Sequence, residues 1–580
     1  MAPMTSPARL GQRLTFSASV DQLVLIACVF WAFSANRLFL GAALKQHGDV
    51  PVAGFALALV VMLVALHYLL IAPFAYRLTV KPLLTLLLFG TAVATHYMRS
   101  YGVVLDTSMM TNVWRTDPTE ARELLSWGLA THLLVYAALP AALLWRVRIS
   151  PQPWPRATAF KLGGLVLAVV AFAAALLPVF KPVASMMRGH KEIRYLAAPA
   201  NFLWSTGAVA AAQARGAAQP RRLLGLDATP GPTWSARTRP LVVVLVVGET
   251  ARAANWQLNG YERPTTPELA RLPVINFSDV SSCGTNTETS LPCMFAPVGR
   301  RDYDEARIRG SESLLHLLVH AGATVHWRDN QSGCKGVCAG LPEDKVVSLN
   351  PAGLCSDGRC LDEGLLVGLN ERLAAARTVN GRAATQLLVL HQLGSHGPAY
   401  FRRYPPAFAH FTPACENDDL QKCTREEIVN AYDNSLRYTD HVLGSLIATL
   451  QRNEADVDSA LIYVSDHGES LGERNLYLHG LPWFIAPKEQ KQVPMVMWLS
   501  SGLARADAID TACLRRRATE PASHDHLFHT VLGLLDVKTA VYEPAWDLAD
   551  GCRSVQFAAP LAGNFGGVAA PSPSRTKQVN

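Results

Sequence analysis

Five long apolar runs in the first 180 residues constrain this chain more than any other feature of its sequence. The runs are Leu23–Leu44, Val52–Phe74, Leu83–Tyr97, Trp127–Trp145 and Leu162–Phe180. A helix that crosses a bilayer needs ~20 predominantly apolar residues, and all but the short third run approach that length. No small-residue cleavage site follows the first run, so we expect an anchor rather than a removed signal peptide. The sequence therefore predicts a multi-pass α-helical membrane domain of about five spans over residues 1–200.

Lys and Arg are concentrated in three of the segments that flank these runs. They stand before the first run (Arg9, Arg13), between the second and third (Arg77, Lys81), and between the fourth and fifth (Arg146, Arg148, Arg156, Lys161). Loops rich in Lys and Arg stay in the cytoplasm, so these three segments are predicted to be cytoplasmic. An odd number of spans then places everything after Phe180 on the outer side of the membrane.

Ten of the 11 cysteines follow residue 280. Their spacing also indicates that this part of the chain lies on the outer side of the membrane. Eight of them form close pairs: Cys283 and Cys293, Cys334 and Cys338, Cys355 and Cys360, Cys415 and Cys423. These spacings lack the pattern of a structural zinc site, so local disulfides in an oxidising compartment fit better than reduced cytosolic thiols. Connectivity does not follow from sequence alone, so this pairing rests on proximity, and that of Cys513 and Cys552 is left open.

Residues 241–560 alternate predicted strands and helices. Leu241–Val247, Gln386–Leu390 and Ala460–Val464 are continuous apolar runs, as expected of strands buried on both faces. Helical stretches such as Ile428–Leu450 lie between them, and this alternation predicts a parallel α/β sheet with helices on both sides. Residues 201–240, Pro-, Ala- and Arg-rich from Ala208 on, are interpreted as a linker and bridging region, and residues 561–580 as a disordered tail.

The overall composition agrees with a membrane part and a soluble part. Half of the 580 residues are hydrophobic and 17% are charged. The net charge of +7 raises the question of a nucleic-acid partner, but the basic residues are dispersed, with no clustered basic and aromatic face. No nucleic-acid partner is therefore expected, whereas a mildly basic surface suits anionic lipid head groups.

Polar residues follow each of the three predicted strands. They are Glu249 and Thr250 after the first, the residues from His391 to His396 after the second, and Asp466 and His467 after the third. Ligands of such sheets bind beyond the carboxyl ends of the strands, so these side chains can converge there. Thr287 opens a further predicted helix. A mixed set of carboxylate and imidazole ligands suits zinc.

Each of these residues also has a plain structural explanation. A Glu after a strand is often a capping residue, a Thr at a helix start is often its N-cap, and a His such as His396 or His479 is often only hydrogen-bonded. Their common place at the ends of strands favours a site. Thr287 suits phosphoryl chemistry, because metal coordination lowers the pKa of a hydroxyl and a helix N-terminus offers N–H donors to phosphate.

Several longer motifs occur in a fixed order along the chain. They are Cys283–Thr287 with Pro292–Phe295, Trp327–Asn330, Gly394–Tyr400, Ser465–Glu473 and Tyr477–Gly480. With these motifs the chain resembles the lipid A phosphoethanolamine transferases, which include the enzymes behind acquired colistin resistance. The resemblance covers roughly residues 20 to 550. It implies an alkaline-phosphatase-like (sulfatase-like) fold for the soluble domain.

The resemblance implies roles for individual residues. It makes Thr287 the nucleophile, and it leaves room for a second zinc ion beside a first, tightly bound one. The ligands of the first ion would be Glu249, Thr287, Asp466 and His467. His396 and His479 would bind the phosphoethanolamine group or the second ion and take part in catalysis, and the substrate pocket would include Asn330, Ser332 and Lys335.

The outer segment Tyr101–Glu123 and the residue after the nucleophile are two further points of interest. By its pattern the segment is either an interfacial helix or a solvated loop. The resemblance favours the helix, because it assigns Asn112 and Glu120 to lipid binding. Glu288 stands where small residues are common in the family, and we expect an acid there to alter acceptor preference.

The implied enzyme lies in the inner membrane of a Gram-negative bacterium, with its catalytic domain in the periplasm. It would transfer phosphoethanolamine from phosphatidylethanolamine to lipid A phosphates through a threonine-linked intermediate, giving resistance to polymyxin and cationic peptides. We expect a monomer whose partners are membrane lipids. Alternatives are transfer to the lipopolysaccharide core or another periplasmic glycan, phosphoglycerol transfer, and a non-catalytic membrane sensor. A sulfatase is disfavoured, because its Cys-x-Pro-x-Arg motif does not occur in this sequence.

Overall fold

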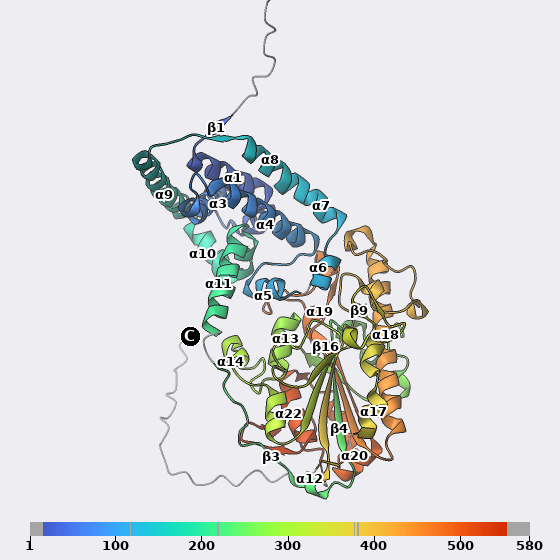
Figure 1. The fold of residues 1–580 in the computed structure, drawn as a ribbon. Helices are drawn as coiled ribbons and strands as arrows, with labels where there is room; N and C mark the ends of the chain where they lie inside the picture. Colours follow the sequence, from blue (N-terminus) through green and yellow to red (C-terminus); the bar gives the residue numbers. More distant parts are fainter. Residues whose placement is uncertain (1–15, 117, 217–219, 376–377, 380–381, 554–580) are drawn as a thin grey trace, which may run out of the picture.

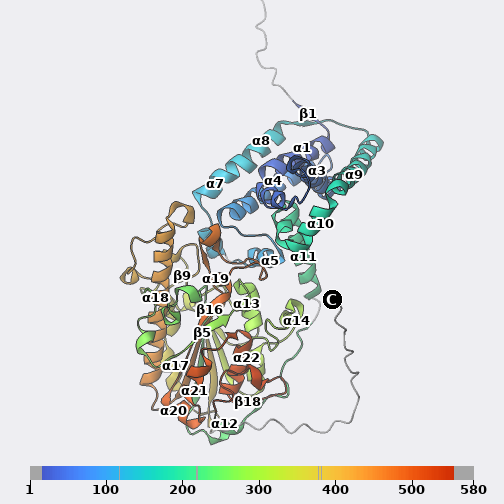
Figure 2. The same ribbon diagram turned by 180° about the vertical axis from the view of Figure 1, so that it is seen from behind.

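The protein has two parts, a bundle of helices and an α/β domain (Figures 1 and 2). This computed structural model describes residues 16–553 apart from 117, 217–219, 376–377 and 380–381. The predicted tail, residues 561–580, lies outside the described residues. Between the two parts lie the short helices α5 (Thr107–Arg115) and α6 (Pro118–Glu123).

The membrane domain consists of helices that follow the predicted apolar runs. They are α1 (Val20–Ser34), α2 (Arg37–Ala43), α3 (Val52–Ile71), α4 (Val80–Ser100), α7 (Trp127–Leu133), α8 (Leu139–Arg146), α9 (Trp154–Leu176) and α10 (Phe180–Gly189). Among the described residues, three helical segments are long and apolar enough to cross a membrane: Val52–Phe74, Trp127–Arg146 and Trp154–Gly189. A fourth results if α1 and α2, with the turn up to Gln46, count as one span bent by 61°. The predicted number of five spans is therefore not confirmed.

The difference between five predicted spans and at most four candidate spans comes from the third run, which lies in α4. This helix has 21 residues, enough to cross a bilayer, but it carries polar residues on a buried face, among them Thr91, Thr95 and His96. Thr95 Oγ1 lies 3.2 Å from His132 Nε2 on α7, so these polar groups are used between helices. They also make α4 less apolar than the three segments named above.

The α/β domain is built on a sheet with the strand order β17-β5-β16-β13-β4-β12-β6-β7. The bounds are β4 (Leu241–Gly248), β5 (Ile275–Ser281), β6 (Thr324–Asp329), β7 (Glu343–Lys345), β12 (Thr385–His391), β13 (Asp458–Ser465), β16 (Gln492–Leu499) and β17 (Ala522–Ser523). The three strands predicted from sequence are the parallel central neighbours β13, β4 and β12. The prediction of a wholly parallel sheet is wrong, because β16 runs antiparallel to both β13 and β5.

Helices cover both faces of the sheet, as the buried strands predicted (Figures 1 and 2). On one face Val243 and Leu245 of β4 join a core with α15 (Leu314–His320) and α22 (Asp525–Leu534). On the other face Val244 joins a core with α18 (Arg425–Arg452). Successive side chains of a strand point to opposite faces, so a strand buried on both sides is apolar throughout. The carboxyl ends of β4, β12 and β13 meet at the edge that faces α5 and α6 (Figure 1).

The predicted linker is partly structured. Helix α11 (Ala200–Gly216) takes up its first part, because the Ala-rich stretch after Ala208 has a high helix propensity. Further along, β3 (Thr229–Pro230) pairs with β18 (Val537–Lys538), which ties the connecting chain to the α/β domain.

Candidate active site and metal centre

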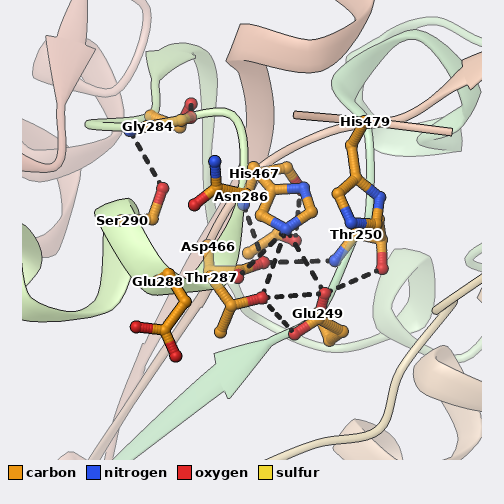
Figure 3. A network of polar contacts seen from close by, with 12 residues as sticks. Glu249, Thr250, Gly284, Asn286, Thr287, Glu288, Ser290, Asp466, His467 and His479 are labelled. Atoms are coloured by element: carbon orange, nitrogen blue, oxygen red, sulfur yellow. Dashed lines mark hydrogen bonds and ion pairs between the residues drawn. The ribbon is translucent and has the colours of Figure 1, made fainter. Parts of the chain in front are cut away.

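Four side chains that the sequence singled out meet at the carboxyl edge of the sheet (Figure 3). Glu249 follows β4, Asp466 and His467 follow β13, and Thr287 begins α13 (Thr287–Met294). The ligating atoms of the two carboxylates and the imidazole lie within 4.8 Å of one another. Thr287 Oγ1 lies 3.1 Å from Glu249 Oε2 and 3.4 Å from His467 Nε2. Three separate stretches of chain thus supply one compact polar cluster.

The turn that carries Thr287 is held from both of its ends. Asn286 is the N-cap of α13, and its side-chain oxygen accepts a hydrogen bond of 2.9 Å from the Thr289 backbone N–H. The Cys283–Cys293 disulfide joins the start of the turn to the end of the helix. The hydroxyl of the first helical residue is therefore presented on a rigid support.

A glycine is required where the β12 loop passes the cluster. Gly394 has a φ of +55°, and a Cβ at this position would lie 2.5 Å from the backbone oxygen of Glu249. Ser395 N–H donates a hydrogen bond of 3.0 Å to that same oxygen. The close approach of the two loops sets the position of the Glu249 carboxylate.

The charges of the cluster are strongly coupled. Burial raises the pKa of Asp466 to about 6, and the charge of Glu249 adds to this rise. Burial lowers the pKa of His467, but the charges of Asp466 and Glu249 outweigh it and raise that pKa to about 10. Asp466 Oδ2 is buried and makes no hydrogen bond within the part of the chain that the structure describes. Two buried carboxylates share one imidazole, so the cluster suits a divalent cation.

The chemistry of these donors fits zinc. Two carboxylates, an imidazole and the Thr287 hydroxyl make a four-membered set of oxygen and nitrogen ligands. His467 Nδ1 donates a hydrogen bond of 3.0 Å to the Gly468 carbonyl, which leaves Nε2 facing the carboxylates. Zinc-binding histidines are commonly oriented through such a bond on the other ring nitrogen.

The two further predicted histidines line the same site. The ring of His479 lies 4.3 Å from that of His467 and 5.6 Å from that of His396, centre to centre. His479 Nδ1 donates to Glu469 Oε2 at 2.8 Å, and the other oxygen of Glu469 accepts from the Tyr400 hydroxyl at 2.6 Å. This chain of bonds fixes the tautomer of His479 and leaves its Nε2 available. Sequence reasoning assigned no role to Glu469.

His524 is a second residue that sequence reasoning missed. It stands before α22 in the interior, where its Nδ1 accepts from the Cys283 N–H and its Nε2 donates to the Ser465 carbonyl, both at 2.9 Å. Burial lowers the pKa of His524 to about 3, so the ring is neutral. It ties the turn that leads to Thr287 to the end of β13. No local pattern marks this residue, because its partners lie 241 and 59 residues away.

The three predicted pocket residues differ in their surroundings. Lys335 Nζ lies 3.2 Å from Glu288 Oε1, next to Thr287, and donates a hydrogen bond of 2.7 Å to Ser332 Oγ. Asn330 donates a hydrogen bond of 2.7 Å to Asp362 Oδ1. The same oxygen accepts from the Leu393 N–H in the loop after β12, so Asn330 braces that loop through Asp362. Lys335 is thus the member of this group that approaches α13.

The outer segment forms helices α5 and α6 rather than an irregular loop, and α5 packs against α13. Ser108 Oγ lies 2.9 Å from Asn286 Nδ2 and 3.1 Å from Thr289 Oγ1. Asn112 lies on α5, and Glu120 lies in α6, where its side chain is outside the described residues. The lipid-binding role of both stays a prediction.

Disulfides link all ten cysteines of the α/β domain. Four of them match the pairs expected from proximity, and a fifth, whose pairing the sequence left open, joins the last two cysteines. The five are Cys283–Cys293, Cys334–Cys338, Cys355–Cys360, Cys415–Cys423 and Cys513–Cys552. Disulfides of this number are typical of an oxidising compartment.

Comparison with known proteins places the chain in a family. The family described as phosphoethanolamine transferase EptA/EptB matches residues 63–214, and the sulfatase family matches residues 242–537. The phosphoethanolamine transferase EptA of Escherichia coli (strain K12) is 38% identical over 477 residues, which cover 82% of this chain and 86% of that protein. This chain belongs to the EptA family of phosphoethanolamine transferases. Phosphatidylethanolamine transferase Mcr-1 of Escherichia coli is 37% identical and covers 90% of this chain and 96% of its own length.

A solved structure of the EptA family agrees over both parts of the molecule. The integral membrane lipooligosaccharide phosphoethanolamine transferase A of Neisseria meningitidis superposes with a TM-score of 0.86 at 35% identity, covering 93% of this chain and 99% of that one. The soluble domain of the same transferase matches at 44% identity over 58% of this chain, with a TM-score of 0.55. The chain is therefore a membrane-anchored protein with a sulfatase-like α/β domain on the periplasmic side.

Proposed function

We propose that this EptA-family member transfers phosphoethanolamine from phosphatidylethanolamine to phosphate groups of lipid A in the inner membrane of a Gram-negative bacterium. The observation that carries the proposal is the place of Thr287, whose hydroxyl lies 3.1 Å from Glu249 at the start of a braced helix. A side chain so placed can act as a nucleophile toward phosphorus. Modified lipid A carries an added amine beside its phosphate and attracts cationic peptides such as polymyxin less strongly.

One zinc ion would be held by Glu249, Asp466, His467 and the Thr287 hydroxyl. Zinc lowers the pKa of a hydroxyl and polarises phosphoryl oxygens when bound. We expect one ion here, because the cluster brings together two carboxylates and one imidazole, which is a ligand set for a single divalent cation. His396 and His479, whose rings lie 5.6 Å apart, would bind a second ion or the head group of the donor lipid.

The reaction we propose is a double displacement on Thr287. Its Oγ attacks the phosphorus of phosphatidylethanolamine, a Thr287–phosphorus bond forms, and diacylglycerol leaves with a proton. His479 is placed to take the proton from the Thr287 hydroxyl and pass it to the leaving diacylglycerol oxygen, because its ring lies 4.3 Å from that of His467 and its Nδ1 donates to Glu469, which leaves Nε2 as the acceptor. A phosphate oxygen of lipid A then attacks the same phosphorus, the Thr287–phosphorus bond breaks, and the Thr287 oxygen takes up the proton that the attacking phosphate gives up.

The same proposal includes the organisation of the chain. Residues 1–200 form the membrane domain, 201–240 connect, and 241–560 form the catalytic domain. Five spans are counted if α1 and α2 form one bent span and α4 is the third. This odd number agrees with a periplasmic α/β domain, and we take the protein to act as a monomer.

Mass spectrometry of lipid A from cells that express the protein tests the proposal. Wild-type protein should add the mass of phosphoethanolamine to lipid A, and Thr287→Ala should abolish this addition while the protein still inserts in the membrane. Ser281→Ala, which removes a nearby hydroxyl bonded to the Ala522 carbonyl, is the matched control and should retain transfer. Transfer by Thr287→Ala at the wild-type level would exclude the nucleophile, and modified core sugars with unmodified lipid A would exclude the acceptor.

A further inference from the structure

Three cations converge on the carboxylate that directly follows the nucleophile. Glu288 is 1% exposed, and its Oε2 lies 2.9 Å from Arg115 Nη1 and 3.3 Å from Arg309 Nη2. Its Oε1 lies 3.2 Å from Lys335 Nζ. The three cations come from three different elements: the end of α5, the end of α14 (Glu305–Arg309) and the loop after β6.

The cluster holds more positive charge than its own acids neutralise. Beside Glu288, the carboxylate of Glu305 lies 3.0 Å from Arg309 Nε, so three cations face two carboxylates. An ion pair buried in this way contributes little net stability, because desolvation offsets its attraction. An excess of guanidinium and ammonium groups beside a nucleophile is instead suited to an anionic ligand.

The position of the cluster indicates which anionic ligand it binds. Arg115 is 37% exposed and ends α5, the helix that lies between the membrane domain and the α/β domain (Figure 1). Glu288 points away from the cluster of Glu249, Asp466 and His467 (Figure 3). An anion bound there would approach from the membrane side and lie beside the nucleophile without occupying the metal centre.

We propose that Arg115, Arg309 and Lys335 form a binding site for a phosphate group of the acceptor lipid. Glu288 fills this site as an internal counter-ion and yields to the acceptor phosphate when it arrives. A phosphate monoester carries up to two negative charges and three acceptor oxygens, so it satisfies the three cations better than one carboxylate does. The inference rests on the proposed function and adds to it the site of the acceptor, with Glu288 as the residue that sets the acceptor's affinity.

The test separates the two halves of the reaction with purified full-length protein in detergent micelles. Diacylglycerol release from phosphatidylethanolamine without acceptor reports the first half, and transfer at increasing lipid A concentration gives the acceptor KM. Arg115→Gln and Arg309→Gln should each raise the acceptor KM about tenfold, more than they change the donor KM, because each removes a charged hydrogen bond to phosphate. Arg307→Gln is the matched control, since this exposed arginine of the same helix pairs only with Asp302 among the contacts described for its side-chain charge.

Glu288→Gln gives the opposite result. It removes the internal charge and keeps the shape of the side chain, so the acceptor KM should fall several-fold. Inorganic phosphate should then compete with lipid A at lower concentration than in the wild type, and calorimetric titration with phosphate should show tighter binding. Adding Arg309→Gln should reverse that gain. Tighter binding of phosphate without a lower KM for lipid A would assign the site to the free ion and overturn the acceptor role.

Two further outcomes would also overturn the inference. If Arg115→Gln and Arg309→Gln lower both halves of the reaction by one common factor, the cluster only holds α5 against α13. If Glu288→Gln leaves the acceptor KM and the phosphate affinity unchanged, Glu288 is not a counter-ion. Failure of the proposed function looks different: the wild-type protein would then release no diacylglycerol, and phosphate titration of Glu288→Gln would still decide whether the anion site exists.

Discussion

His524 links the stability of the catalytic turn to pH. Its folded-state pKa is about 3 against an ordinary value of 6.5, because the ring is buried and the charge of His467 lowers the pKa further. A lowered histidine pKa means that the unfolded chain binds the extra proton, so stability falls as pH drops below 6.5. At pH 5 the group is 1.5 pH units below that value, and at ~1.4 kcal/mol per unit the loss is about 2 kcal/mol relative to pH 8.

His524→Gln isolates this effect, because glutamine has a donor and an acceptor but does not titrate between these pH values. Unfolding of the full-length protein in detergent by denaturant, followed through tryptophan fluorescence, gives the difference in free energy between wild type and variant. We expect that difference to shrink by about 2 kcal/mol between pH 8 and pH 5. The other titrating groups cancel in the comparison. A difference that stays constant over this range would refute a neutral, bridging His524.

Two predictions concern the centre itself. Removal of divalent metal by a chelator should lower the midpoint temperature of thermal unfolding. Asp466→Asn should make that drop smaller, because it removes one of the two buried negative charges that hold the cation. An equal drop in both proteins would contradict a cation at this cluster. Gly394→Ala should reduce diacylglycerol release at least about tenfold by forcing a Cβ toward the Glu249 backbone, whereas Gly260→Ala, also at positive φ but with open space around it, should retain the rate.

The features that could be predicted from sequence are those written in local patterns. Continuous apolar residues marked β4 as a doubly buried strand, and the polar residues after β4 and β13 marked the edge where Glu249 and Asp466 meet. Close cysteine spacing marked four of the disulfides. In each of these cases the signal lies within about ten residues of sequence, even where, as for Glu249 and Asp466, the side chains that meet come from distant segments.

What could not be predicted depends on contacts between distant segments. Cys513 and Cys552 are 39 residues apart, and His524 meets Cys283 across 241 residues. The antiparallel course of β16 is a matter of topology rather than of its own apolar sequence. For α4 the sequence predicted the helix, but whether its polar residues face lipid or other helices is decided by packing.

The catalytic turn is held from the membrane side as well as from within the α/β domain. Ser108 of α5 contacts Asn286, which caps the helix that Thr287 begins. Glu123 of α6 pairs with Arg403, whose Nε donates a hydrogen bond of 2.7 Å to the His396 carbonyl. The outer segment between two membrane helices therefore supports both the turn that carries Thr287 and the loop that carries His396. Because a lipid substrate reaches the site from the bilayer, an enzyme of this kind gains from having the surface that meets the lipid also position the residues that act on it.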